Sequence, residues 1–318
     1  MHKTWTRMSI RLLRNLRSLS LIKFSHKRRK LGYMALTGIV ASIVLAIGLF
    51  LGFTDFSLSQ DLAGLTDLQA SLPTVDKTIA AAGSGKLTVV YAPVTKPFHR
   101  DLEKVAKKSK AFERLAGVIS QTISLPRDIP VVFGTCNQIN AFYDPTNHRV
   151  VMCYDLVEHF STLFGSSNVF KSKREAQVNA GRAAVFVFFH EIGHMLAGEL
   201  ELPITGKGED AADQFSTLFL EKAGGVAEES ALAGATWFKL ESAVPKPIRY
   251  WGEHSLDMQR FYSIVCLLYG SNPKQYTSLV KKEGVSAQRL QKCEREYGQS
   301  AKAWRTLLTP YVKKGAIL

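Results

Sequence analysis

Acidic residues are absent from the first 54 positions of the chain, and Asp55 is the first. Ten of the 41 Lys and Arg residues lie within residues 1–30, and the rest of the chain carries 31 basic and 27 acidic side chains. The net charge of +14 is therefore largely a property of the amino-terminal tail. A nucleic-acid-binding domain carries its basic surface on the folded part, so this distribution argues against nucleic acid as a partner.

Charged residues and histidine are also absent from residues 31–53, LGYMALTGIVASIVLAIGLFLGF. A helix of this length measures about 34 Å, which is enough to cross the hydrocarbon core of a bilayer. A buried core helix is the alternative, but the run directly follows four basic residues at 27–30. We therefore predict one transmembrane anchor in contact with membrane lipid. The basic tail 1–30 is expected in the cytoplasm and the chain after Phe53 across the membrane.

A cleavage site of the Ala-x-Ala type is missing after this run, and the run is longer than the apolar region of a signal peptide. A cleaved signal peptide is therefore the weaker alternative. Within the tail, residues 7–24 place Arg7, Arg11 and Arg14 on one helical face, opposite leucine and isoleucine. A basic amphipathic helix lying on anionic lipid and an unstructured basic tail both fit this pattern.

Cysteine is scarce, and no C-x-x-C pair is present, which argues against a cysteine-based zinc site. All four cysteines follow the predicted anchor, in a compartment expected to be oxidising. We predict two disulfides and favour the neighbour pairing Cys136–Cys153 and Cys266–Cys293 among the three possible connectivities. Each bridge would contribute about 3 kcal/mol in the chain-entropy model.

No internal repeat is visible, and residues 54–86 have the composition of a flexible linker. We predict a folded domain over 87–318, with strands over 87–93, 129–136 and 149–154. Helical spacing covers 98–123, and turn chemistry covers 140–147. After residue 155 the pattern is mainly helical. A strand-rich half followed by a helix-rich half predicts an α+β fold, with a small amino-terminal sheet and a helical carboxy-terminal part.

The apolar helix predicted over 174–200 is interrupted by His190, Glu191 and His194. The His-Glu-x-x-His spacing places both imidazoles on one helical face, where they can bind one metal ion. Glu191 then projects beside the metal, where a general base for a metal-activated water must lie. Two core histidines without a metal are the alternative, but their burial among phenylalanines without partners would be costly.

A third ligand is needed, and the third histidine of the long metzincin motif is missing. A second helix predicted over 208–220 carries Glu209 and Asp213 on one face. We predict Glu209 as the third ligand and Asp213 as the acceptor of the spare N–H of a ligand histidine. Asp210 is the alternative for either role. Glu199, nearer the motif, is interpreted as part of a solvated helix end.

These residues resemble known proteins. His190-Glu191-x-x-His194 followed by Glu209-x-x-x-Asp213 is similar to the gluzincin arrangement. The segments HEIGHMLAGELELPITGKGEDAADQF, NHRVVMCYDL and EHSLDMQRFY, with the paired cysteines, resemble a family of bacterial metallopeptidases whose substrate is not established, over most of 87–315. The resemblance implies a zincin-like fold and one Zn²⁺ per chain. It also implies that His190, His194 and Glu209 bind this ion, that Glu191 is the base, and that Asp213 supports a ligand.

Two further elements fit this chemistry. The strand over 149–154 is expected to pair with an extended substrate, although an ordinary sheet strand is an equal alternative. His254 is our candidate donor to the carbonyl oxygen on which negative charge develops, with Tyr262 behind it. A surface histidine without a catalytic role is the alternative for His254.

The sequence thus predicts a zinc metallopeptidase that acts on peptide or protein substrates. In a bacterium, the predicted anchor would hold its catalytic domain on the periplasmic side of the cytoplasmic (inner) membrane. One alternative is a non-catalytic metal-binding protein of the cell envelope. Another is a zinc hydrolase acting on a non-peptide amide of the cell wall.

Overall fold

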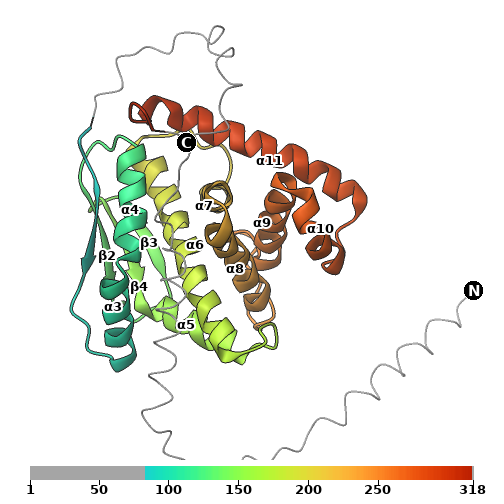
Figure 1. Ribbon diagram of the computed structural model, residues 1–318, viewed down its shortest axis with the longest axis horizontal. Helices are drawn as coiled ribbons and strands as arrows, with labels where there is room; N and C mark the ends of the chain where they lie inside the picture. The colour runs from blue at the N-terminus through green and yellow to red at the C-terminus, as the bar shows by residue number, and fades with distance from the viewer. Residues whose placement is uncertain (1–82, 317–318) are drawn as a thin grey trace, which may run out of the picture. The chain divides into compact units, whose positions relative to one another are not determined.

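The computed structural model describes residues 83–316 (Figure 1). The predicted tail 1–30, the predicted anchor 31–53 and all but the end of the predicted linker 54–86 lie outside the described residues. Within 83–316, every helix is too short or too polar to span a bilayer.

A four-stranded sheet with the strand order β1-β2-β4-β3 opens the described part of the chain. β1 (Leu87–Tyr91), β2 (Ile129–Gly134) and β4 (Arg149–Cys153) run parallel, and β3 (Ala141–Asp144) pairs antiparallel with β4. The predicted strands are therefore present. The turn predicted over 140–147 is wrong in its first half, because β3 lies there. All four β3 residues are half-buried, so no alternation of buried and exposed positions marked this strand.

Helices make up most of the remaining described chain. They are α3 (Pro97–Ser109), α4 (Ala111–Thr122), α5 (Tyr154–Ser166), α6 (Lys173–Glu199), α7 (Gly208–Ala223), α8 (Gly225–Glu241), α9 (Asp257–Ser271), α10 (Pro273–Lys282), α11 (Ala287–Leu308) and the 3-10 turn η2 (Thr309–Tyr311). This order confirms the α+β prediction. The single helix predicted over 98–123 is instead two helices, because Lys110 adopts a left-handed conformation with φ 50°. Neither Gly nor Pro marks that break.

Helix α6 is the centre of the hydrophobic core, and α5, α7, α8, β3 and β4 all pack against it (Figure 1). Its middle turns are buried on all sides, with Phe186, Phe188 and Phe189 almost wholly excluded from solvent. Gly193 permits the close approach of α7, because a Cβ there would lie 3.2 Å from the Cα of Ala212. This approach brings the first turns of α7 beside the His-Glu-x-x-His segment.

Both predicted disulfides are present. Cys136–Cys153 joins the loop after β2 to the end of β4, and Cys266–Cys293 joins α9 to α11. Cys153 also directly precedes α5.

Asp155, in the first turn of α5, fastens the loop that carries Cys136. Its carboxylate accepts the backbone N–H groups of Cys136 at 2.8 Å and Asn137 at 3.1 Å, and it pairs with Lys96 Nζ at 2.6 Å. Burial alone would raise the pKa of Asp155. The Lys96 ammonium and the Cys136 N–H outweigh burial, so the pKa lies below its ordinary value.

We expect Asp155→Asn to destabilise residues 84–318 by about 1–3 kcal/mol near neutral pH, because the variant lacks the charge-assisted bonds. The pKa of Asp155 is lower in the folded protein than in the unfolded chain. Its contribution to stability is therefore fully present at pH values above the pKa of the unfolded chain. This contribution is lost as the pH falls through the pKa of the folded protein. Urea unfolding should therefore show a difference between wild type and variant near pH 7 that shrinks below about pH 3.

The matched control is Asp101→Asn, because Asp101 pairs at the surface with Lys104 at 3.3 Å. This variant should change stability by less than about 1 kcal/mol. If Asp155→Asn lowered the free energy of unfolding equally at both pH values, the stabilisation would not come from the charge of Asp155.

Candidate metal centre

Helix α6 presents His190 and His194 one turn apart, with their Nε2 atoms facing each other at 3.1 Å. The His190 side chain is 7% exposed and that of His194 is 25% exposed. Glu191 lies between them in the chain and is buried. The spacing thus places two imidazole nitrogens at one point near the surface of the core.

Helix α7 brings Glu209 to the same point. Its Oε2 lies 3.2 Å from His190 Nε2 and its Oε1 lies 3.3 Å from His194 Nε2. One ligand atom from each of these three residues lies within 4.8 Å of the others, an arrangement that could hold a metal ion. Glu209 is in the first turn of α7, after a connection that turns at Glu201 and Gly206, both with positive φ.

Asp213, one turn further along α7, orients His190. Its Oδ1 lies 2.8 Å from His190 Nδ1, and both side chains are buried. The carboxylate accepts the Nδ1–H, so the lone pair of Nε2 faces Glu209 and His194. This is the usual support of a metal-binding histidine.

Arg260 of α9 completes this support, and sequence reasoning missed it. Its guanidinium donates to both oxygens of Asp213 at 2.7 Å, and its Cζ lies 3.9 Å from the centre of the Phe238 ring. Burial raises the pKa of Asp213, but Arg260 outweighs burial and the pKa is lowered. A signal was present in the sequence, since Arg260 lies at helical spacing from the buried Ile264 and Leu268.

The donor set fits a metal ion of the zinc type, for which imidazole nitrogen and carboxylate oxygen are common ligands. Glu209 Oε2 is buried and makes no well-directed hydrogen bond to the described residues, although His190 and His254 lie near it. Burial lowers the pKa of His190, but Asp213 and Glu209 outweigh burial and raise it to about 9. The local potential therefore favours a cation.

Glu191 lies on the side of α6 toward the sheet. Burial raises the pKa of Glu191 above its ordinary value, although the nearby imidazoles and the backbone of Tyr143 in β3 act in the opposite direction. The Tyr143 ring lies against Gly198, where a Cβ would come within 2.8 Å of the ring. The packing of β3 on α6 thus places the Tyr143 backbone near Glu191.

Glu199 fixes this register. Its side chain, only 2% exposed, accepts hydrogen bonds from Tyr143 Oη at 2.7 Å and from His148 Nδ1 at 2.7 Å, and it pairs with Arg127 at 3.2 Å. Our interpretation of Glu199 as part of a solvated helix end is therefore wrong. No local pattern around Glu199 indicates that the β3–β4 hairpin covers the end of α6.

Strand β4 cannot take the substrate-pairing role expected for residues 149–154. It is paired on one side with β2 and on the other with β3, so its backbone groups are already used. The edge of the sheet beside Glu191 is β3. The strand order, which the sequence pattern does not contain, decides this point.

His254, in the loop before α9, lies at the centre. Its Nε2 is 2.9 Å from Glu209 Oε2, and its side chain is 58% exposed. Asp210, the alternative ligand, instead accepts a hydrogen bond from Ser255 Oγ at 3.1 Å. It is absent from the ligand group found among the described residues.

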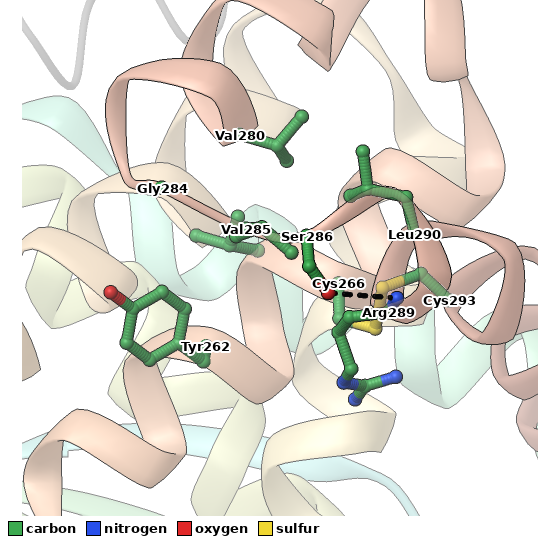
Figure 2. A pocket seen from close by; sticks show the side chains of 10 residues that line it. Tyr262, Cys266, Val280, Gly284, Val285, Ser286, Arg289, Leu290 and Cys293 are labelled. Atoms are coloured by element: carbon green, nitrogen blue, oxygen red, sulfur yellow. Dashed lines mark hydrogen bonds between the residues drawn. A yellow bond between two sulfur atoms is a disulfide. The ribbon is translucent and has the colours of Figure 1, made fainter.

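Tyr262, the second candidate donor after His254, lies away from the metal centre. Its hydroxyl donates to the carbonyl of Glu283 at 3.1 Å. Figure 2 shows Tyr262 among the side chains around a cavity of about 320 Å³ between α9, α10 and α11, beside the Cys266–Cys293 disulfide. None of the metal-site residues lines this cavity.

Fold and site together indicate a metallopeptidase-type protein, in which one helix supplies two histidines and a glutamate and the next helix supplies a carboxylate. Residues 91–308 match the model of a protein family described as "Putative metallopeptidase", and the chain belongs to this family. The predicted family resemblance is thereby confirmed. Comparisons with curated proteins and with solved structures gave no significant match.

We expect purified residues 84–318 to bind one divalent metal ion per chain. Glu209→Ala should weaken zinc affinity about 100-fold or more, since it removes the only anionic ligand of the group. Metal content after dialysis and competition with a chromophoric chelator measure this effect. Asp210→Asn is the matched control and should bind zinc as tightly as wild type. If Asp210→Asn weakened zinc binding and Glu209→Ala did not, Asp210 would be the third ligand.

We expect Arg260→Met to destabilise the metal-free protein by about 3–5 kcal/mol, because it leaves the buried Asp213 without its cation. The double variant Asp213→Asn/Arg260→Met removes both charges and should recover part of the loss. Urea unfolding in the presence of EDTA measures both.

Arg289→Met is the control for Arg260→Met, since Arg289 pairs with Glu296 at a side chain 40% exposed. Its effect should stay below about 1 kcal/mol. A double variant less stable than Arg260→Met would contradict the charge-pair explanation.

Proposed function

We propose that the protein is a zinc-dependent metallopeptidase with a zincin-like catalytic domain. The observation that supports this most directly is the convergence of His190, His194 and Glu209 beside the buried Glu191, in a chain of a metallopeptidase family. His190, His194 and Glu209 would bind the ion. A zinc ion held there would polarise the scissile carbonyl and activate a water molecule.

Glu191 is the general base in this proposal. Its carboxylate takes the proton of the attacking water and passes it to the amine that leaves. Burial raises its pKa, which suits a group that must both accept and return a proton.

The Asp213–Arg260 pair keeps His190 in one tautomer and one orientation. His254 Nε2 lies 2.9 Å from Glu209 Oε2, at the solvent-exposed side of the centre. We assign to it the stabilisation of charge on the carbonyl oxygen, which develops as the amide is attacked.

Strand β3 is our candidate for the contact with substrate backbone. It is an edge strand of the sheet and packs against α6, the helix that carries Glu191. An extended peptide added at such an edge gains main-chain hydrogen bonds, which are largely independent of its sequence. We further propose that residues 31–53 anchor the protein in the bacterial inner membrane and that the domain acts in the periplasm.

We expect Glu191→Gln to retain the metal and to lose at least about 10³-fold in kcat, because the amide cannot accept the proton of water. Hydrolysis of a casein-derived peptide mixture, followed by mass spectrometry, measures this loss beside the zinc content. Glu294→Gln, on the exposed face of α11, is the control and should retain full activity.

Undiminished turnover by Glu191→Gln would remove this residue from the mechanism. Release of cell-wall fragments by the wild type without any peptide cleavage would instead identify a non-peptide amide as the substrate.

A further inference from the structure

The α8–α9 loop, residues 242–256, exposes a group of large apolar side chains. Ile248 is 56% exposed, Tyr250 77% and Trp251 83%. Aromatic side chains of this size bury much apolar area when they are covered, so their joint exposure marks a binding surface. We call Ile248, Tyr250 and Trp251 the loop tip.

The base of this loop is bound to the metal centre. Lys207 Nζ donates to the carbonyl of Gly252 at 3.3 Å, Ser255 Oγ donates to Asp210 at 3.1 Å, and His254 lies 2.9 Å from Glu209. All three partners belong to the start of α7, which supplies the carboxylate ligand. Two residues separate Trp251 from His254, so their Cα atoms lie within about 11 Å of each other.

The other end of the loop is also held. Lys246 Nζ pairs with Asp257 at 2.6 Å and with Glu241 at 3.4 Å, so it links the last residue of α8 to the first of α9. Pro245 and Pro247 flank it and limit the backbone. The loop tip is therefore exposed although both ends of the loop are held in place.

The accessible side of the metal centre is the side of this loop. Side-chain exposure increases from 7% for His190 to 16% for Glu209, 25% for His194 and 58% for His254. The side chain of the centre that solvent reaches most, His254, therefore belongs to the loop that carries the loop tip. Insertion of the tip into a bilayer would turn this same side toward lipid, which argues against a membrane as the occupant.

We propose that the loop tip binds a bulky apolar side chain, aromatic or long aliphatic, of the peptide whose backbone lies at the metal centre. This assignment rests on the proposed function for its class of ligand. Tyr250 and Trp251 supply two rigid aromatic surfaces at low entropic cost, and Ile248 extends them. The loop tip would thus determine which peptides are held near His254 and Glu209.

The test uses the full chain in detergent micelles with added zinc, and Glu191→Gln to prevent turnover. The probes are fluorescein-labelled decapeptides of Gly, Ala, Ser and Lys that carry one Phe at each position in turn, or none. Fluorescence anisotropy gives their affinities. We expect the best Phe peptides to bind about tenfold more tightly than the Phe-free peptide. Tyr250→Ser/Trp251→Ser should reduce this preference to less than about twofold.

Two controls accompany this comparison. Val169→Ser removes an apolar side chain of similar exposure, 54%, near the start of α6, and should retain the preference. Trp251→Phe keeps an aromatic ring and should retain most of it. Zinc content of the double variant should equal that of Glu191→Gln, which shows that its centre is intact. The proposal is overturned if Glu191→Gln shows no preference for Phe peptides. It is also overturned if the double variant keeps that preference.

The same experiment separates this proposal from the proposed function. The wild type could cleave none of these peptides while the Phe preference still depends on Tyr250 and Trp251. That result would refute the proposed peptidase function and leave the proposed role of the loop tip standing. If brominated phospholipids in reconstituted vesicles quench Trp251 fluorescence, and Trp251→Phe abolishes that quenching, the loop tip lies in a membrane and the peptide assignment is overturned.

Discussion

The buried carboxylate of Asp213 is the group on which the arrangement of the centre depends. It is shared between His190 of α6 and Arg260 of α9, while its own helix α7 carries Glu209. One side chain therefore connects the three helices that form the centre. An ionised carboxylate is costly to bury unless cations and N–H groups surround it, so this contact exists only when all three helices are in place. Tertiary structure and ligand geometry are for this reason formed together.

Packing around α6 explains why such a polar group is tolerated in a hydrophobic core. The phenylalanines of α6 supply the apolar burial that stabilises the domain, while Gly193 lets α7 come close enough for its polar face to reach the histidines. The Cys266–Cys293 bridge then fixes α9, which carries Arg260, to α11. At the sheet, Asp155 and Cys136–Cys153 fasten the loop that leads into β3, and β3 packs against α6.

Local pattern in the sequence was sufficient for much of this structure. The strands β1, β2 and β4 and the helices α6 and α7 follow from periodicity and spacing. The neighbour pairing of the cysteines was the favoured one of three, and Glu209 was favoured over Asp210 beside His190 and His194. What could not be predicted depends on contacts between distant segments. The strand order decided that β3 and not β4 is the edge, the cover over α6 decided that Glu199 is buried, and the Arg260 contact spans 47 residues. The break at Lys110 had no Gly or Pro to mark it.

The contact between Gly198 and Tyr143 has a consequence for the descent of this family. Any side chain at position 198 larger than hydrogen would collide with the ring at position 143, which lies 2.8 Å from the place of its Cβ. A larger residue at 198 therefore requires the ring at 143 to shift or to be replaced by a smaller side chain. Joint variation at 143 and 198 across homologous chains would thus record how the β3–β4 hairpin and α6 have moved relative to each other.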